Sequence, residues 1–408
     1  MKQSLLATKT RKDISSQEKS LNAKLLLKAG FIDQLMAGVY SYLPLGYRVI
    51  QKIEKIVREE MNAIDGQEIL MPAIHPKEVL ETTGRWDTID VLYKFQTFYT
   101  KMEVALGSTH EEIITPLTKK FIKSYKDLPL SLYQIQTKFR DEKRAKSGIL
   151  RGREFIMKDL YSFHTDEQDL NKYYDKAIIA YQNIYKRLGI GDQTYKVYAS
   201  GGTFSKYSHE FQTLSEIGED TVYICDKCHI GVNQEIISDQ PNCPECSGDL
   251  HQKSAIEVGN IFKLNTKFSD AFSLKFTNQD GSNKSVIMGC YGIGISRLMG
   301  TLVEIFAESE NKMVWPKSVS PFQVHLIGLN LNDDLILEKA NQIYNKFLEL
   351  NIEILFDDRN ESTGKKLADA DLIGIPNRLI ISKKSLENGG IEFENKIYSI
   401  DNILDIII

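Results

Sequence analysis

The chain has 408 residues, 42% of them apolar, which is long for one hydrophobic core and typical of a globular protein with two or three domains. Its 51 Lys and Arg face 55 Asp and Glu, and the net charge of −4 excludes attraction of nucleic acid by overall charge. No apolar run approaches the roughly 18 residues of a membrane span, and the N-terminus lacks the apolar stretch of a secretory signal. We therefore expect a soluble, cytoplasmic protein whose RNA contacts, if any, come from local basic patches.

The first part of the chain mixes helices with neighbouring strands. Apolar residues recur with a helical period over 46–66, and residues 67–74 then predict a strand that Pro76 stops. Further strands are predicted over 93–100, 131–139 and 154–163, followed by an amphipathic helix over 170–189. This order favours an antiparallel sheet.

The pattern changes near residue 320. Before it, residues 285–291 predict a strand and residues 294–308 a helix entered through the glycines of YGIG. After it, strands and helices alternate, which indicates a small domain with a parallel or mixed sheet. Its predicted elements are strand 322–330, helix 338–351, strand 353–358, a helix before Pro376 and strand 378–382.

Four of the five cysteines form two C-x-x-C pairs. Cys225 and Cys228 make the first pair, Cys243 and Cys246 the second, and the stretch 229–242 lies between them. Each pair can place two thiolates on one ion, and two pairs complete a tetrahedral site with no open position. We expect structural Zn²⁺ in a zinc ribbon, although the spacing does not separate zinc from iron. The alternative is four unligated buried cysteines.

Two charged segments have the residue types needed to bind phosphates. In KFRDEKRAKSGILRGREF, Arg140 precedes Glu142 by two residues, which would put both on one face of a strand, and Arg151 follows a basic loop. An isolated R-x-E is usually a strand with solvated charges. In GCYGIGISRLM, Arg297 lies in the first turns of a helix after a glycine-rich strand exit, where a guanidinium can reach a phosphate.

These two segments resemble motifs 2 and 3 of the class II aminoacyl-tRNA synthetases, and the helix and strand that end at MPAIHP resemble motif 1, the dimer element of that family. Longer strings resemble the bacterial-type prolyl-tRNA synthetases over nearly the whole chain: LLLKAGFIDQLMAGVYSYLPLG, GSTHEE, FRDEKRAKSGILRGREFIMKDLYSFH, SHEFQ, EVGNIFKLNTKFS and DDRNESTGKKLADADLIGIP. Seryl, threonyl and glycyl relatives share the three motifs but are not expected to share these strings.

The resemblance implies an α+β fold with two domains. Residues 1–320 would form the class II antiparallel-sheet catalytic domain, with a zinc-ribbon-like insertion at 221–254, and residues 321–408 an α/β anticodon-binding domain. It also implies a homodimeric proline–tRNA ligase. Such an enzyme uses ATP with Mg²⁺ to convert L-proline to prolyl-adenylate and then transfers the prolyl group to the 3′ end of tRNA(Pro).

Roles for single residues follow from the same resemblance. A secondary ammonium needs an anion and acceptor oxygens, and a carboxylate that attacks phosphorus needs an arginine that holds both anions together. Arg140 and Arg297 would be catalytic. The residues facing proline would be Thr109, Glu111, Arg140, Asp159, His209 and Cys290. The residues binding ATP would be Arg140, Glu142, Arg151, Phe155, Gln212 and Arg297.

Several of these residues have structural alternatives. Phe155 lies in an apolar strand and would be assigned to the core from strand periodicity alone. Asp159 and His209 are lone polar residues, which are usually satisfied structural groups. Asn260 stands in EVGNIF where many family members carry His, so no role is transferred to it.

The C-terminal segment DDRNESTGKK holds the residues expected to face RNA. Base-specific reading of unstacked nucleotides needs polar side chains on a sheet rim, and the resemblance places Asp358, Arg359 and Lys366 there. A charge cluster of this kind is otherwise a solvated loop.

An editing domain is expected to be absent. Bacterial-type relatives commonly carry one between the segments that correspond to CDKCHIGVNQE and EVGNIF. Here only the stretch 236–256 separates Glu235 from Glu257, which is too short for a folded hydrolytic domain.

Two other classes of function stay open. A class II paralogue that has lost aminoacylation would keep the fold, but the retained Arg140, Glu142 and Arg297 argue against it. A zinc-ribbon module that binds nucleic acid would explain residues 225–246 alone. Proline-dependent ATP–pyrophosphate exchange separates the three, because only the ligase catalyses it.

Overall fold

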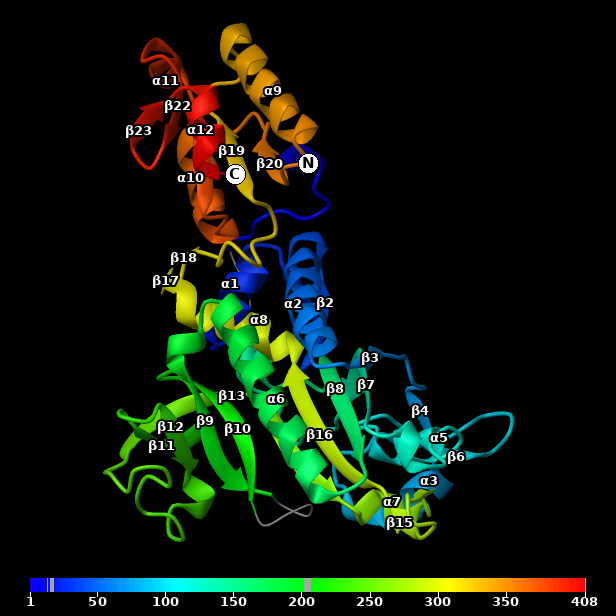
Figure 1. Cartoon of the computed structure of the whole chain (residues 1–408). Coiled ribbons are helices and arrows are strands. Elements are labelled where there is room, and N and C mark those ends of the chain that lie inside the picture. Colours follow the sequence, from blue (N-terminus) through cyan, green and yellow to red (C-terminus); the bar gives the residue numbers. More distant parts are fainter. Residues whose placement is uncertain (13, 15–17, 202–206, 408) are drawn as a thin grey trace. The chain divides into compact units, whose positions relative to one another are not determined.

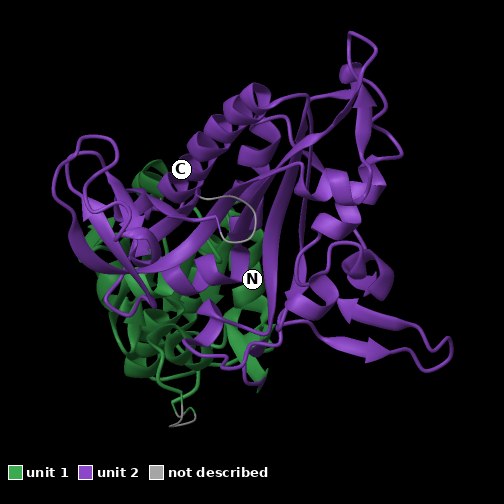
Figure 2. Cartoon of the chain, turned by 90° about the horizontal axis from the view of Figure 1, so that it is seen from below, with its two compact units in different colours: residues 1–35, 40–52, 302–408 green, residues 36–39, 53–301 purple. Residues whose placement is uncertain are grey.

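The computed structural model describes residues 1–12, 14, 18–201 and 207–407. The chain divides into two compact units (Figure 2). Unit 1 comprises residues 1–35, 40–52 and 302–408, and unit 2 comprises residues 36–39 and 53–301. Among the described helices, none combines the length and apolar character needed to cross a lipid bilayer.

Unit 2 is built on a nine-stranded sheet with the strand order β10-β9-β12-β11-β13-β16-β8-β7-β3. Its pairs are antiparallel except β9 with β12 and β3 with β7, so the predicted antiparallel core sheet is confirmed. The strands are β3 (Gln67–Glu68), β7 (Leu130–Phe139), β8 (Glu154–His164), β9 (Thr194–Ser200), β10 (Tyr207–Leu214), β11 (Asp220–Cys225), β12 (Ile230–Asn233), β13 (His251–Asn265) and β16 (Ile287–Gly294).

Helix α6 (Glu167–Arg187) covers one face of this sheet (Figure 1). Asp166 caps the helix by accepting a hydrogen bond from the Asp169 amide, and the tyrosines and aliphatic residues of its apolar side are buried. Gly259 in β13 lies against the helix, since a Cβ there would come within 2.4 Å of the Tyr185 hydroxyl. Side chains alternate along a strand, so Asn260 points to the opposite face.

The remaining elements of unit 2 surround the sheet. The helix predicted over 46–66 is α2 (Pro44–Ala63), which begins in unit 1. A three-stranded sheet has the order β4-β6-β5. The other elements are β4 (Ile74–Pro76), α3 (Lys77–Glu81), α4 (Arg85–Thr88), β5 (Lys94–Gln96), β6 (Glu103–Leu106), α5 (Glu111–Thr118), α7 (Lys267–Ala271), β14 (Lys275–Thr277), β15 (Asn283–Ser285) and α8 (Ile295–Phe306).

Two predicted strands are much shorter than expected. The predicted strand 67–74 pairs only at Gln67–Glu68, because the Met71 amide donates to the Gln134 side chain and Pro72 has no amide hydrogen. The predicted strand 93–100 ends at Gln96, after which the chain turns back into β6. A side-chain hydrogen bond and a proline interrupt the first predicted strand, and a turn interrupts the second.

Unit 1 contains a five-stranded mixed sheet with the order β20-β19-β21-β22-β23. Strand β19 is parallel to β20 and β21, as the alternating pattern predicts. The first residues of the chain also belong here, since the Phe356 amide donates to the Met1 carbonyl at 2.9 Å. The elements are α1 (Leu21–Lys28), β1 (Ile32–Met36), β2 (Val39–Tyr42), β17 (Ala307–Ser309), β18 (Lys312–Met313), β19 (Val324–Gly328), α9 (Asp334–Glu349), β20 (Ile354–Asp357), α10 (Thr363–Ile373), β21 (Asn377–Ile381), α11 (Lys383–Glu387), β22 (Ile391–Phe393), β23 (Lys396–Tyr398) and α12 (Ile400–Ile407).

Candidate active site

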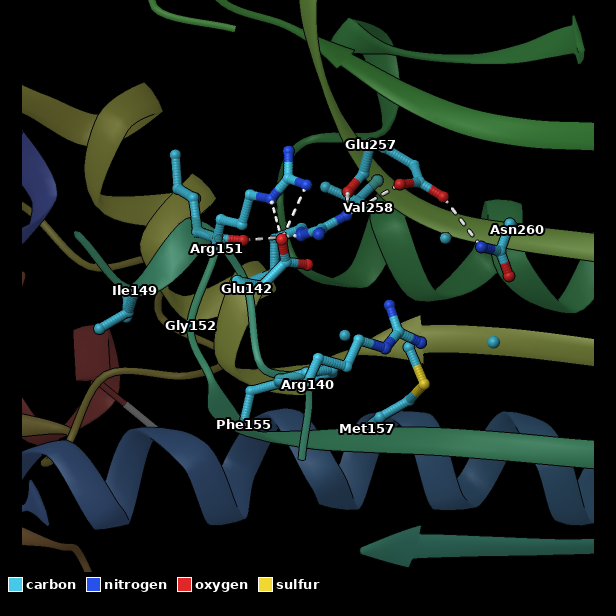
Figure 3. A pocket seen from close by; sticks show the side chains of 15 residues that line it. Arg140, Glu142, Ile149, Arg151, Gly152, Phe155, Met157, Glu257, Val258 and Asn260 are labelled. Carbon is cyan, nitrogen blue, oxygen red and sulfur yellow. Dashed lines mark hydrogen bonds and ion pairs between the residues drawn. The ribbon is translucent and has the colours of Figure 1, made fainter. Parts of the chain in front are cut away.

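A pocket lies in unit 2 on the sheet face opposite α6 (Figure 3). Its walls come from the loop between β7 and β8, from β8, β13 and β16, and from the start of α8. Residues that line it include Arg140, Glu142, Arg151, Phe155, Asn260 and Arg297. The structure thus brings together five of the six residues assigned to ATP by resemblance.

Arg140 and Glu142 lie after the strand, not on one face of it as the sequence predicted. Strand β7 ends at Phe139, and the Glu142 amide donates to the Arg140 carbonyl at 2.7 Å in a tight turn. The Arg140 amide still donates to the Arg153 carbonyl at 2.8 Å as the next pair of the β7–β8 ladder, but the Asp141 amide donates to the Val91 carbonyl at 2.8 Å, so the chain leaves the sheet there. Both side chains still reach the pocket, and Glu142 accepts from Arg151 at 2.9 and 3.1 Å.

The Arg140 guanidinium extends from the pocket towards the loop that carries Thr109. It lies 5.2 Å from the centroid of the Phe155 ring, within cation–π range. Its Nη2 donates to the Ser108 carbonyl at 3.5 Å, a long hydrogen bond. Burial, and next the nearby Arg297, lower the pKa of Arg140. Burial and a neighbouring cation thus both disfavour the charged guanidinium, and an anionic ligand would offset them.

Arg297 is held at the start of α8 by backbone and carboxylate oxygens. Its Nε donates to the Leu150 carbonyl at 2.9 Å, and its Nη1 donates to the Glu257 carbonyl at 2.8 Å and to Glu257 Oε2 at 3.0 Å. The other carboxylate oxygen of Glu257 accepts from Asn260 at 2.9 Å. Asn260, to which the resemblance transferred no role, therefore orients the carboxylate that fixes Arg297.

Strand β16 runs from the pocket, which Gly292 lines, to Cys290 in a second, buried group. Asn260 pairs with Gly292 across β13 and β16, and a Cβ at Gly292 would come within 2.9 Å of Asn260 Oδ1. A larger residue at this position would displace the Asn260 side chain, which lines the pocket. Cys290, two residues earlier, faces the same side of the sheet.

The buried group contains Thr109, Glu111 and Cys290. The Thr109 hydroxyl donates to Glu111 Oε2 at 2.6 Å, and the Cys290 thiol donates to Glu111 Oε1 at 3.4 Å. Burial raises the pKa of Glu111, but Arg85 and the Thr109 hydroxyl outweigh it and hold this pKa below its usual value. Burial raises the pKa of the Cys290 thiol, which excludes a thiolate nucleophile. The group therefore presents a carboxylate, that of Glu111, beside the small side chain of Cys290.

Asp159 and His209 have structural partners. Asp159 lies 2.7 Å from the ammonium of Lys138, which is fully buried, and accepts from Gln134 at 3.0 Å. His209 Nδ1 is 2.8 Å from the Tyr174 hydroxyl, and burial lowers its pKa to about 4, so its ring is neutral. Each side chain therefore has a structural partner, although Asp159 Oδ1 and His209 Nε2 are buried and accept or donate no hydrogen bond among the described residues.

Gln212 is not brought into the pocket. Its side chain is fully buried and donates to Glu210 and Asp220, each at 2.9 Å. Burial, and next the carboxylate of Glu257, raise the pKa of Glu210 to about 8. The Gln212 amide thus binds two carboxylates, those of Glu210 and Asp220. Asp220 and Glu257 line a second cavity that shares Arg140, Glu142 and Arg297 with the first pocket.

Two charged residues at the buried group were missed from the sequence. Arg85 contacts Glu111, and Lys138 contacts Asp159. Neither residue was assigned a role from the family strings. For Lys138 the available signal was a lysine in an otherwise apolar and amide-rich strand.

The four paired cysteines meet at one point of unit 2. Their sulfur atoms all lie within 4.8 Å of one another, and the sulfurs of Cys225 and Cys246 are 3.7 Å apart. A tetrahedral ion with Zn–S bonds of about 2.3 Å would hold its sulfurs about 3.8 Å apart. The arrangement is compatible with zinc.

The residues predicted to face RNA are largely occupied within unit 1. Lys366 is 1% exposed and donates to the carbonyls of Gly328 and Asp357 at 2.6 and 3.2 Å, so the prediction that it faces RNA is wrong. The guanidinium of Arg359 is bound by Asp357 and Asp369. The Asp358 carboxylate accepts from Ser4.

Comparisons with known proteins agree with this geometry. Residues 93–306 match the tRNA synthetase class II core domain (G, H, P, S and T), and residues 323–396 match the anticodon binding domain. A proline–tRNA ligase of Geobacillus sp. is 33% identical over 564 aligned residues, covering 100% of this chain and 99% of that protein. One of Staphylococcus haemolyticus is 34% identical, covering 95% and 94%.

Among solved structures, the Giardia lamblia prolyl-tRNA synthetase in complex with prolyl-adenylate has a TM-score of 0.77 with this chain. It is 19% identical, and the match covers 96% of this chain and 78% of that one, which shows a common fold. Because the two curated relatives are 33% and 34% identical to it, the chain belongs to the prolyl-tRNA synthetases, class II aminoacyl-tRNA synthetases with proline–tRNA ligase activity.

Proposed function

We propose that Arg140 is the catalytic bridge between proline and ATP. The observation that carries this proposal is the position of its guanidinium, which lines the nucleotide pocket and also contacts the carbonyl of Ser108, the neighbour of Thr109. The proline carboxylate and the α-phosphate are both anions, and one guanidinium can pair with both. A carboxylate oxygen then forms a bond to the α-phosphorus as the bond to pyrophosphate breaks, giving prolyl-adenylate.

Proline would bind with its imino group at Thr109 and Glu111 and its ring against Cys290. The buried carboxylate of Glu111 matches a secondary ammonium in charge, and the Thr109 hydroxyl fixes the orientation of that carboxylate. Asp159 and His209 stay weaker candidates for this pocket, because each already has a partner.

ATP would lie along β13, β16 and the start of α8. Phe155 would stack on the adenine, Glu142 would bind the adenine amino group or a metal, Arg151 would contact phosphate, and Arg297 would bind the γ-phosphate. A role for Gln212 at the ribose requires its amide to leave Glu210 or Asp220. Mg²⁺ that arrives with ATP would neutralise phosphate charge, and the pocket carboxylates are the oxygen ligands this ion takes.

The second step would transfer the prolyl group to tRNA(Pro). The 3′-terminal ribose hydroxyl attacks the activated carbonyl, an ester forms, and the bond to AMP breaks. The match of residues 323–396 supports anticodon reading by the mixed sheet of unit 1. Of the residues proposed to face RNA, Asp358 and Arg359 keep that assignment. The homodimer and the cytoplasmic location stay predictions drawn from the family.

Structural Zn²⁺ at the four cysteines is part of the proposal, supported by the sulfur distances. So is the absence of an editing domain. The alignment with the Geobacillus relative runs over 564 residues and this chain has 408, so 564 less 408 leaves 156 aligned positions without a counterpart here. That length is typical of a folded domain.

The test is ATP–pyrophosphate exchange with each of the twenty amino acids. We expect exchange that depends on proline and far exceeds that with the other amino acids except, at high concentration, alanine. Exchange that needs tRNA to be present, or that is equal for several amino acids, would contradict the assigned pocket.

A further inference from the structure

We infer that Arg85 is a positioning residue for proline: it anchors one oxygen of Glu111 so that the other oxygen receives the imino group. This inference rests on the proposed assignment of Glu111 to that imino group. Arg85 lies outside the strings used to assign the site and belongs to a separate short helix, α4.

The chain conformation before Arg85 brings its side chain to the first turn of α5. Gly84 has φ of +71°, a left-handed conformation that disfavours other residues, and α4 begins directly after it. The preceding Thr83 hydroxyl donates to Glu112 Oε1 at 2.9 Å. Both Thr83 and Arg85 therefore bind carboxylates in the first turn of α5.

One guanidinium nitrogen serves two buried carboxylates. Arg85 Nη1 lies 3.2 Å from Glu111 Oε2, and 3.0 and 3.1 Å from the two oxygens of Glu112. The side chains of Glu111 and Glu112 are 4% and 0% exposed, and that of Arg85 is 17% exposed. Carboxylates this deep stay ionised only if a cation compensates them.

The two oxygens of Glu111 have different partners. Oε2 accepts from Arg85 and from the Thr109 hydroxyl, whereas Oε1 accepts from the thiol of Cys290, a weak donor at 3.4 Å. A carboxylate oxygen can accept two hydrogen bonds. Oε1 is thus the oxygen that can still accept a hydrogen bond from an N–H group of proline. It lies next to Cys290, against which the proline ring would pack.

The charge of Glu111 depends on groups from several elements. Burial lowers the pKa of His75 to about 4 and that of His110 to about 2, so both rings are neutral at pH 7. The Lys138 ammonium is 2.7 Å from the Asp159 carboxylate. The other titratable or charged groups that act on Glu111, or on which it acts, are Arg85, Glu112, Arg140, Tyr161, Lys267 and Cys290.

The experiment compares the Arg85→Gln and Arg85→Lys variants by proline-dependent exchange. We expect Arg85→Gln to raise KM for proline by at least about 10-fold, with KM for ATP within about 2-fold, because only the proline side has lost a charged contact. Arg85→Lys, which keeps the charge, should recover part of the loss. Equal increases in both KM values would overturn the inference.

A pH profile separates positioning from a structural role. Without Arg85, burial raises the pKa of Glu111, so the carboxylate takes up a proton as pH falls, and a neutral acid cannot pair with the proline ammonium. We therefore expect KM for proline of Arg85→Gln to rise as pH is lowered from 8.5 to 6, while that of the wild type stays flat. Parallel profiles would count against the inference.

A double variant keeps the test valid if the single one is unstable. Arg85→Gln with Glu112→Gln removes one positive and one negative charge, so the net charge of the buried group is unchanged. We expect recovered stability with KM for proline still raised. Recovery of both would show that Arg85 only supports the fold.

The matched control is Arg58→Gln, which breaks an exposed ion pair of 2.7 Å with Glu68 in the same unit. Neither KM should change. If the wild type itself lacks proline-dependent exchange, the proposed function fails; if it is active and Arg85→Gln is normal, only the role of Arg85 fails.

Discussion

At the scale of single residues, Arg140 has the largest predicted effect on chemistry. Two anionic reactants would meet at its guanidinium, and removing it leaves their repulsion uncompensated. We expect Arg140→Ala to reduce the exchange rate by about 100- to 1,000-fold or more, with the thermal midpoint nearly unchanged. Arg144→Ala, an exposed change in the same loop, is the control and should leave tRNA-independent exchange intact. Wild-type exchange by a folded Arg140→Ala variant would refute the assignment.

His325 gives a prediction about pH and stability. Its ring is fully buried in β19, bonded to Gln3 at 3.0 Å, and burial lowers its pKa to about 3. Below about pH 6.5 the unfolded chain binds a proton that the folded chain does not, so this residue costs about 1.4 kcal/mol of stability per pH unit as pH falls. That loss continues until the pH reaches the folded pKa.

His325→Asn should therefore lose less stability in acid than the wild type does. We expect the variant to be less stable at pH 7.5 because the packing is altered, and the difference to shrink between pH 6.5 and 4.5. Chemical denaturation at four pH values measures it. Parallel stability curves would mean that the ring is protonated, or accessible, in the folded protein.

Among the elements of the fold, the cysteine-rich insertion should depend on its metal. Four thiolates that close around one ion contribute binding energy to folding. We expect about one metal per chain by elemental analysis, and Cys228→Ser should lower both metal content and the thermal midpoint. Cys290→Ser is the matched control, since it removes the fifth cysteine and should leave metal content unchanged. Metal-free protein of unchanged stability would exclude the ribbon.

Periodicity predicted the longer elements of unit 2. Helices α2 and α6 and strands β7 and β8 follow their predicted ranges closely. It failed where a hydrogen bond to a distant part of the chain replaces the strand pairing, as at Met71, whose amide donates to Gln134, and at Asp141, whose amide donates to the Val91 carbonyl. Those contacts join residues far apart in sequence, so no local pattern contains them.

In the candidate site, too, some residues could be assigned from the sequence and others could not. Thr109, Glu111, Arg140 and Arg297 were assigned from family strings, and the structure brings Thr109 to Glu111 and Arg140 and Arg297 to one pocket. Arg85 was missed because its role depends on the turn at Gly84, which aims it at a helix some 26 positions further along the chain. Polar residues whose partners lie on other strands could not be separated from ligand-binding ones by sequence.

At the scale of the whole molecule, the proposed function assigns the two units to different parts of the reaction. The pocket lies entirely within unit 2, whereas residues 323–396, which match the anticodon binding domain, lie in unit 1. Helix α8 belongs to both, with Arg297 in the part assigned to unit 2 and residues 302–306 in unit 1. If the pocket is the activation site, we expect proline activation to be measurable without RNA, which is why the tests of the pocket use exchange without tRNA.

The last prediction concerns fidelity of the whole enzyme. Alanine is smaller than proline, so a pocket that admits proline cannot exclude it sterically, and discrimination rests on lost contacts worth about 10- to 200-fold per missing methylene. We expect alanine-dependent exchange at high alanine concentration. Since only the stretch 236–256 lies between Glu235 and Glu257, we also expect no removal of alanine from tRNA by this chain.

The measurement is deacylation of preformed alanyl-tRNA(Pro) by purified enzyme, compared with buffer alone and with mild base as proof that the ester can be hydrolysed. Hydrolysis at the buffer rate, together with alanine-dependent exchange, is the expected pair of results, and it assigns any correction to a separate protein. Enzyme-dependent hydrolysis that survives Arg140→Ala would place an editing site elsewhere in the chain. Loss of that hydrolysis in the variant would instead place it in the synthetic pocket, because the two activities would then share one guanidinium.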